Sequence, residues 1–243
     1  MGTRSATSFG QSLGRAVSRW RGGRLLHPRG RSFEGHVELW GGLAGHVATG
    51  PGRFPATIRL SRGVPTPEGW PDVLGLAIRI HTATRPVDLL VSSAGRPPVL
   101  RHLPLPRRDF AGPYSSILSY RRAGRRCYLS AEARPLGARL DAVAARVRDG
   151  AVVFVLSAAS ATGRWVPFGQ ATLREPLPAT ADAALAFDPI GNHPTGLLPA
   201  GLIQRTRAVA YAVSRRSRGA GEQHGPAPGE QHGRAAAEPY TRR

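Results

Sequence analysis

The sequence contains no lysine, only one cysteine and no long apolar run. A single thiol, Cys127, excludes an internal disulfide and a cysteine-rich metal site within the chain, and we expect it to be a partly buried structural thiol. No stretch approaches the ~18 consecutive apolar residues that a membrane-spanning helix needs. Residues 1–24 are polar and arginine-rich, and no apolar signal-peptide core follows them. We therefore expect a cytoplasmic protein without a membrane span.

The absence of lysine also shapes the charge, because all the cationic side chains behind the net charge of +19 are arginines. Such uniformity is more typical of a GC-rich codon bias than of a surface selected to bind phosphate. The sequence shows no zinc-finger spacing, no RNA-binding aromatic motif and no helix-turn-helix. We therefore expect nucleic-acid binding to be nonspecific at most, and a basic nucleic-acid-binding module stays open only as an alternative.

Hydrophobic residues make up 41% of the chain, which is enough for a buried core. Between clusters of glycine and proline, several short segments are apolar or alternate with a period of two, as strands do. The segments that predict strands are 56–61, 74–80, 87–92 and 151–157. Their regular spacing predicts an antiparallel sheet or barrel.

Two segments, 134–149 and 197–218, have apolar residues at helical spacing. The predicted fold class is therefore α+β, a compact antiparallel β-barrel with added helices. We divide the chain into a flexible basic arm (1–21), one folded domain (22–219) and a disordered low-complexity tail (220–243) that repeats Gly-Glu-Gln-His-Gly.

In the second predicted helix, Arg207 and Tyr211 are four residues apart and thus neighbours on one helix face. A guanidinium close to a phenol favours the phenolate and lowers the pKa of the tyrosine. Phenolate is one of the few protein ligands of haem iron. Such a pair is also common on exposed helices, so its meaning depends on the rest of the chain.

The rest of the chain resembles the haem-dependent catalases over about residues 22–219. Arg24-Leu25-Leu26-His27-Pro28-Arg29-Gly30, continued by Phe33, Glu34 and Gly35, resembles the segment that carries the distal histidine of catalases. The remaining similar segments follow in the family's order: 59–61, 71–79, 88–90, 187–189, 196–199 and the helix with Arg207, Tyr211 and Arg218.

This resemblance implies a catalase-like core that binds haem b, with Tyr211 as the axial ligand of the iron and Arg207 as the residue that stabilises its phenolate. His27 is then the distal acid–base group, and Ser61 supports its ring. The remaining implied haem contacts are Arg24, Arg59 and Arg218 at the propionates and Phe110 on the face of the haem. Arg59 and Ser61 are two residues apart on a predicted strand and should face the same side.

One departure from the family concerns the substrate. Where catalases have a distal asparagine, this chain has Ser92-Ser93, with Ser93 as the closest match. A hydroxyl is shorter than an amide and has one donor, so efficient turnover of hydrogen peroxide is in question. The resemblance implies a minimal catalase or peroxidase that acts on a small peroxide, as a monomer or small homo-oligomer. An organic-hydroperoxide peroxidase, an allene-oxide-synthase-like isomerase and a haem-binding protein without turnover remain open.

Overall fold

The computed structural model describes residues 29–63 and 67–200. Its strands are β1 (Arg29–Leu39), β2 (Gly52–Arg62), β3 (Leu74–His81), β4 (Pro86–Ser93), β5 (Tyr114–Ser115), β6 (Tyr120–Arg122), β7 (Arg125–Glu132), β8 (Val152–Ala159), β9 (Val166–Pro176) and β10 (Leu198–Pro199). Its helices are α2 (Gly41–Val47), α3 (Leu140–Asp149), α4 (Ala179–Ala184) and the short 3-10 helix η1 (Leu100–His102). Within the described ranges, no helix is long and apolar enough to cross a membrane.

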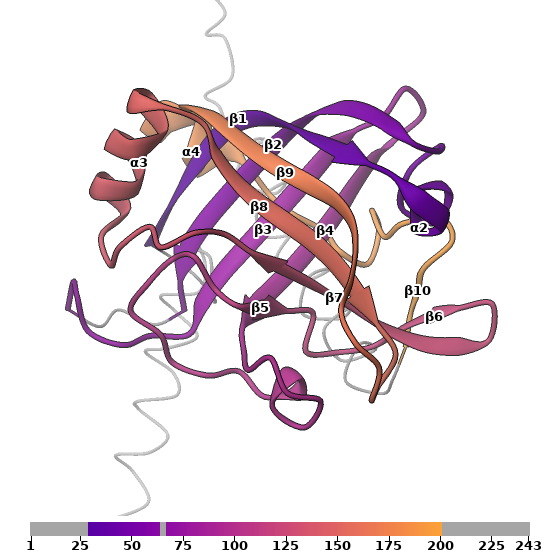
Figure 1. Cartoon of the computed structure of the whole chain (residues 1–243). Coiled ribbons are helices and arrows are strands. Elements are labelled where there is room, and N and C mark those ends of the chain that lie inside the picture. The colour runs from indigo at the N-terminus through magenta and orange to yellow at the C-terminus, as the bar shows by residue number, and fades with distance from the viewer. Residues whose placement is uncertain (1–28, 64–66, 201–243) are drawn as a thin grey trace, which may run out of the picture.

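Eight of the strands close into an antiparallel barrel, as the sequence predicts (Figure 1). The hydrogen-bonded order runs β5-β4-β3-β2-β1-β9-β8, and β7 closes the ring because it pairs with both β8 and β5. The small strands β6 and β10 extend the sheet beside β7. Closure satisfies the edges that an open sheet would leave unpaired.

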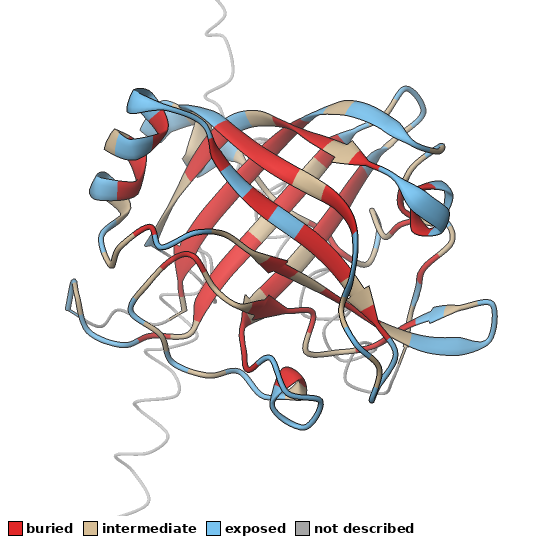
Figure 2. Cartoon of the chain, in the orientation of Figure 1, coloured by how far each residue is buried: buried red, intermediate tan, exposed pale blue. Residues whose placement is uncertain are grey.

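The interior of the barrel follows from strand alternation. Because directly paired residues share a face, the register places Phe33, Ile58, Ile78 and Leu89 in one row across β1–β4. All four side chains are buried. The adjacent row contains Leu60, Leu76 and Val91, which are also buried. Figure 2 shows buried stretches along these strands, whereas the outer turns of α3 are exposed.

Strand β1 lies between β2 and β9, and its pairing with β9 is irregular. The register of β1 against β9 shifts between Glu34 and Gly35, as it does in a β-bulge. A Cβ added at Gly35 would lie 1.9 Å from the carbonyl oxygen of Thr172, so only glycine permits this approach. Gly35 thus allows β1 and β9 to approach closely at the bulge.

The helices differ most from the sequence prediction. Helix α3 begins at Leu140 rather than at residue 134, because Pro135 and Gly137, whose φ is +97°, hold the preceding segment out of the helical conformation. The short α2 follows β1 and was not predicted. The predicted helix 197–218 begins with β10 in the structure, and its residues from 201 onward lie outside the described residues.

Candidate functional site

The outer face of β1–β4 combines small side chains with buried polar groups. The register aligns Gly30, Ser61, Gly75 and Ser92 in one row across the four strands. None of these side chains is larger than a hydroxymethyl group, so the row is flat. Ser61 is buried, and its hydroxyl donates a long hydrogen bond of 3.4 Å to the carbonyl oxygen of Gly75.

The next row along the strands contains Arg59, which is paired with Ser32 on β1. The Arg59 guanidinium is buried and donates from Nε to Asp182 Oδ1 of α4 at 3.0 Å. Ser32 donates to the same carboxylate oxygen at 2.5 Å. A Cβ at Gly30 would lie 2.4 Å from the Arg59 guanidinium, so the guanidinium rests on the glycine backbone. Asp182 thereby anchors α4 to this face.

The third row contains a buried ion pair. Arg79 donates two hydrogen bonds to Asp88, from Nε at 2.8 Å and from Nη2 at 2.7 Å. Asp88 is fully buried, and its hydrogen bond raises the pKa of the Arg79 guanidinium. The same guanidinium lies 5.1 Å from the centre of the Phe187 ring. Two opposite charges thus neutralise each other where either alone would be costly.

This ion pair also binds the segment 186–193 to the barrel. Asp88 accepts hydrogen bonds from the Asp188 backbone at 2.7 Å and from the Asn192 side chain at 3.0 Å, and its own backbone N–H donates to the Asn192 carbonyl. Arg79 donates to the Ala186 carbonyl. A little further along the chain, Arg85 donates to the His193 carbonyl and to Thr195. The residues that lead toward the Arg207–Tyr211 pair are therefore fixed at the edge of β3–β4.

The structure brings Arg59 and Ser61 together on this outer face, as expected for residues two apart on a strand. Arg59 is bound to Asp182 there, and its predicted contact with a propionate stays a prediction. The other predicted groups, Arg24, His27, Arg207, Tyr211 and Arg218, lie outside the described residues.

Ser93 points to the opposite face of β4. It is fully buried, accepts a hydrogen bond from the Leu74 backbone at 2.9 Å and donates to the Leu105 carbonyl at 2.7 Å. Its hydroxyl thus connects β3 and the loop after β4, and the structure does not bring it to Ser61. Ser92, paired with Gly75, is the serine on the Ser61 face. A role for Ser93 at the peroxide stays a prediction.

Phe110 is a fully buried member of the main apolar cluster. Its carbonyl accepts a hydrogen bond from the Tyr114 hydroxyl at 2.8 Å, and burial raises the pKa of that phenol. The structure gives Phe110 a packing role, and its contact with a haem stays a prediction. Cys127 is half-buried, as expected, and burial raises the pKa of its thiol.

Sequence reasoning missed two residues of this face. Ser92 depends on the exact register of the hairpin: its last pair is His81 with Pro86, and counting outward from this pair places Ser92 opposite Gly75 and beside Ser61. Asp182 had no comparable signal, because it is 123 residues from Arg59 in the sequence.

Comparison with known proteins gives a match at the level of structure only. No family model matches the chain, and no curated protein does. A bacterial catalase matches with a TM-score of 0.60 and 14% identity, over 90% of this chain and 62% of the catalase. A fungal catalase matches with a TM-score of 0.62 and 14% identity, over 88% and 63% of the two chains.

Catalase A from Saccharomyces cerevisiae matches with a TM-score of 0.62 and 12% identity, over 89% of this chain and 65% of the catalase. The chain thus spans less than two-thirds of the length of these three catalases. Identities this low carry information about the backbone rather than about activity. What the chain shares with these catalases is the fold of a closed antiparallel barrel with few helices.

Proposed function

We propose that this protein is a haem-binding oxidoreductase that metabolises a peroxide, built on a catalase-like barrel. The observation that carries the proposal is the outer face of β1–β4, where Arg59 lies beside the flat row of small residues that contains Ser61, in a fold shared with catalases. Such a row admits a planar macrocycle, so the residues present fit haem b. When bound, haem supplies an iron centre that reacts with peroxides.

The residues that would hold the group are Tyr211 at the iron and Arg24, Arg59 and Arg218 at its propionates. Arg207, four residues before Tyr211 in the sequence, would favour the phenolate through its positive charge. The segment 186–193 is fixed to the barrel by Asp88, and this attachment limits where the following chain can lie. We therefore assign Arg79 and Asp88 a positioning role for the haem-binding helix.

On the opposite side, His27 would take a proton from one peroxide oxygen and return it to the other. His27 precedes β1 by two residues, and β1 begins beside the end of β2 that carries Ser61. Ser61 would hold the imidazole ring, and Ser92 shares its face. We propose Ser92, rather than Ser93, as the hydroxyl closest to the substrate, because the Ser93 hydroxyl is bound on the other face.

The first test is an absorption spectrum of protein expressed with ample haem. We expect about one haem b per chain with ferric phenolate ligation. Tyr211→Phe should lose or loosen the haem while the barrel stays folded, and Arg207→Leu should change the reduction potential. His27→Ala should retain haem but lose peroxide cleavage by roughly 100-fold or more. Haem that is retained with an unchanged spectrum in Tyr211→Phe would contradict the assignment.

The two serines provide a matched pair of variants for the substrate side. Ser92→Asn should raise hydrogen peroxide turnover by restoring an amide on the Ser61 face. Ser93→Asn should mainly destabilise the fold, because the larger amide must enter a fully buried site. If only Ser93→Asn raises turnover, the choice of Ser92 is wrong.

A second candidate function is turnover of an organic hydroperoxide, by a peroxidase or isomerase reaction. The observation in its favour is Ser92, whose short side chain leaves more space on the Ser61 face than an asparagine. Parallel assays with hydrogen peroxide and cumene hydroperoxide distinguish the two. If the haem-loaded protein acts on neither, a haem-binding role without turnover replaces both.

A further inference from the structure

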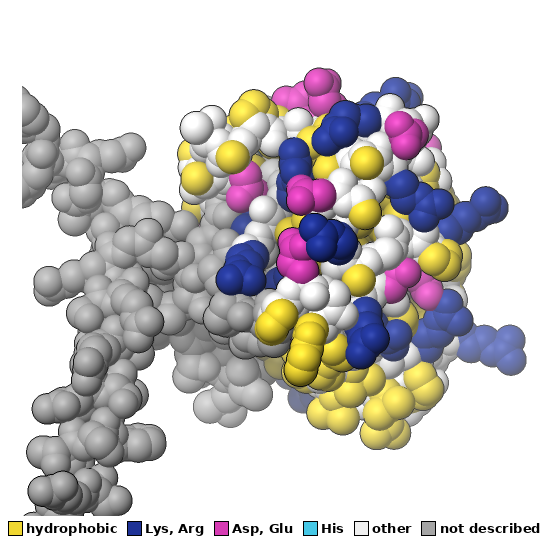
Figure 3. Space-filling view, turned by 90° about the vertical axis from the view of Figure 1, so that its left-hand side faces the viewer, with side chains coloured by type: hydrophobic (Ala, Val, Ile, Leu, Met, Phe, Trp, Pro, Cys, Tyr) yellow, Lys and Arg dark blue, Asp and Glu magenta, His cyan; other side chains and the backbone are white. Residues whose placement is uncertain are grey.

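The loop between β4 and β5, residues 95–108, presents apolar side chains to solvent. Val99 is 74% exposed, Leu103 is 49% exposed and Leu100 is 39% exposed. Four exposed prolines lie in the same loop, at positions 97, 98, 104 and 106. Figure 3 shows hydrophobic side chains gathered at the lower end of the molecule, where Figure 1 places η1. An apolar cluster of this kind is typical of an interaction site.

This loop is held firmly to the turn between β8 and β9. Arg101 is buried and donates to the carbonyl oxygens of Ser160 at 2.8 Å and Gly163 at 3.0 Å. Its guanidinium lies 4.4 Å from the centre of the Trp165 ring, and the Trp165 indole donates back to the Arg96 carbonyl. The loop that carries the exposed apolar side chains is thus fixed to the β8–β9 turn by these contacts. Val166, at the end of the same turn, is 63% exposed.

A basic hairpin lies beside this loop. The His102 ring contacts the Tyr128 ring of β7, with 4.4 Å between their centroids. The tip of the β6–β7 hairpin, which precedes Tyr128 on β7, contains four arginines, at positions 121, 122, 125 and 126. The loop therefore contacts β7 at the base of the hairpin, and in Figure 1 the hairpin extends to the right from this contact.

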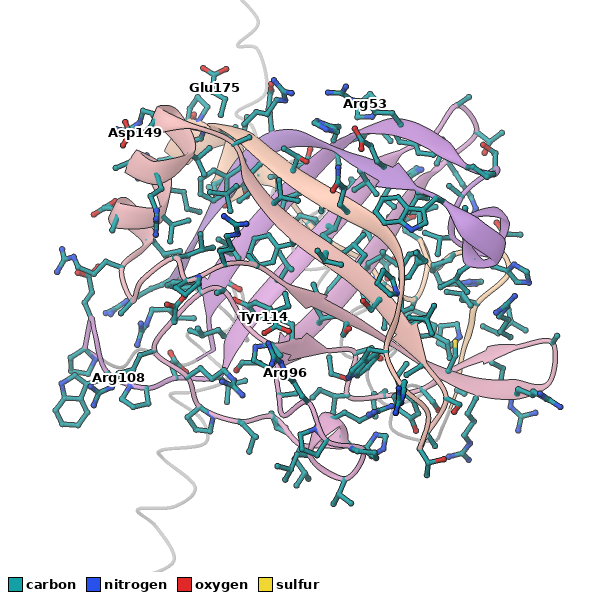
Figure 4. The ribbon with its side chains drawn as sticks, viewed as in Figure 1. Arg53, Arg96, Arg108, Tyr114, Asp149 and Glu175 are labelled. Carbon is teal, nitrogen blue, oxygen red and sulfur yellow. The ribbon has the colours of Figure 1, made fainter. Side chains whose placement is uncertain are left out.

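We call this surface, made of residues 95–108, 119–128 and 160–168, the basic–apolar surface. Its three segments contain nine arginines and no acidic residue, but Arg101 is buried and Arg96 pairs with the neighbouring Glu132 of β7. The opposite end of the molecule has both signs of charge: Figure 4 places Asp149, Glu175 and Arg53 at the upper end, and Arg96 and Arg108 at the lower end. The two ends therefore differ in that acidic side chains accompany the arginines at the upper end.

We propose that the basic–apolar surface docks onto an anionic lipid bilayer. Exposed Val99, Leu103 and Val166 gain by entering the interfacial layer of the membrane, and the hairpin arginines gain by approaching lipid phosphates. A nucleic acid would match the charge but offers no layer for the aliphatic side chains. The orientation places the hairpin and the 95–108 loop against the membrane, with α3 facing the solvent (Figure 1).

Sedimentation with lipid vesicles tests this proposal. We expect at least about tenfold tighter binding to vesicles of three parts phosphatidylcholine and one part phosphatidylglycerol than to phosphatidylcholine alone. Raising the salt from about 0.1 M to about 1 M, which shortens the Debye length from ~10 Å to ~3 Å, should release most of the protein. The assay needs neither haem nor peroxide, so its failure is distinguishable from a failure of the proposed function.

Variants separate the contribution of the apolar side chains to vesicle binding from that of the arginines. Val99→Glu with Leu103→Glu should lower vesicle binding about tenfold or more, and the milder Val99→Ser with Leu103→Ser serves if the first pair folds poorly. The control is Val153→Glu, which changes an exposed valine on β8 outside the surface. Arg125→Gln with Arg126→Gln should lower binding about tenfold or more, whereas Arg148→Gln with Arg174→Gln, an equal loss of charge elsewhere, should lower it less.

Three results would overturn the proposal. One is equal binding to both kinds of vesicle, or to neither. Another is binding that the surface variants and their controls weaken equally. The third is a parent protein that forms a dimer by light scattering, with Val99→Glu and Leu103→Glu restoring the monomer, because the surface would then join two copies of the chain.

Discussion

The outer faces of two parts of the same barrel differ in what covers them. On β1–β4 the outward side chains include Arg59, Ser61 and Asp88, and all three are buried. On β8 the outward side chains include Val153 and Val155, and both are exposed. The polar outer face of β1–β4 is thus covered by other segments, whereas the apolar outer face of β8 is exposed to solvent.

The difference shows which face has hydrogen-bond and ion-pair partners from other parts of the chain. Buried polar groups require hydrogen bonds or opposite charges, and α4 and the segment 186–193 supply them through Asp182 and Asp188. Exposed valines on a strand need none. Burying polar groups costs desolvation free energy, so the covered face of β1–β4 is the stronger candidate for function. Ser61 lies on this face.

The largest expected effect is that of Asp88→Ala on the covered face. The change leaves the Arg79 guanidinium without its carboxylate and detaches the segment 186–193, so the free energy of unfolding should fall by about 3–5 kcal/mol. Urea unfolding measures this loss. The control is Asp141→Ala, which breaks an exposed pair with Arg31 and should cost less than about 1 kcal/mol. Equal losses would mean that the Asp88 pair is not structurally special.

The next effect comes from glycine replacements. Gly30→Ala should lower the free energy of unfolding by about 1–3 kcal/mol, because the new methyl group must displace the buried Arg59 guanidinium. Gly45→Ala lies in α2 with no atom within 4 Å of the added Cβ, and it should raise the same quantity by about 0.5–1 kcal/mol. Thermal melting reports both, and a harmless Gly30→Ala would show that Arg59 is less tightly held than its burial indicates.

Outward-facing β-branched residues give a smaller and more direct contrast. Thr57 on β2 is buried, and its hydroxyl lies 2.9 Å from the His81 ring. Thr57→Ala should cost about 1–2 kcal/mol of unfolding free energy. Val155→Ala on the open face should stay within about 0.5 kcal/mol. If the two substitutions cost the same, the distinction between covered and open faces fails.

The smallest effect concerns pH. Burial lowers the pKa of His36, and Arg53 and Arg174 lower it further, although Glu38 acts in the opposite direction. The unfolded chain therefore binds the proton more readily, and stability should decrease as pH falls below the ordinary histidine value of ~6.5. His36→Gln should flatten the dependence of unfolding free energy on pH between about 7.5 and 5.5. An unchanged slope would show that His36 contributes nothing to it.

Much of the barrel was predictable from local pattern. The strand predictions at 56–61, 74–80 and 87–92 fall within β2, β3 and β4, and 151–157 begins one residue before β8, because alternating or continuous apolar residues report burial directly. The helix predicted at 134–149 begins only at Leu140. Apolar residues continue at helical spacing before it, but Pro135 and Gly137 keep the backbone there out of the helical conformation. The roles of His27, Arg207 and Tyr211 stay predictions.

The sequence by itself determined the alternation of its strands and the separation of two residues on β2 that puts Arg59 and Ser61 on one face. Each of these depends on neighbours in the chain, for which sequence spacing and spatial spacing are nearly the same. The tertiary structure alone decided that Asp182 meets Arg59, and that the loop 95–108 joins the β6–β7 hairpin. Those contacts join residues far apart in the sequence, and only the closure of the barrel brings them together.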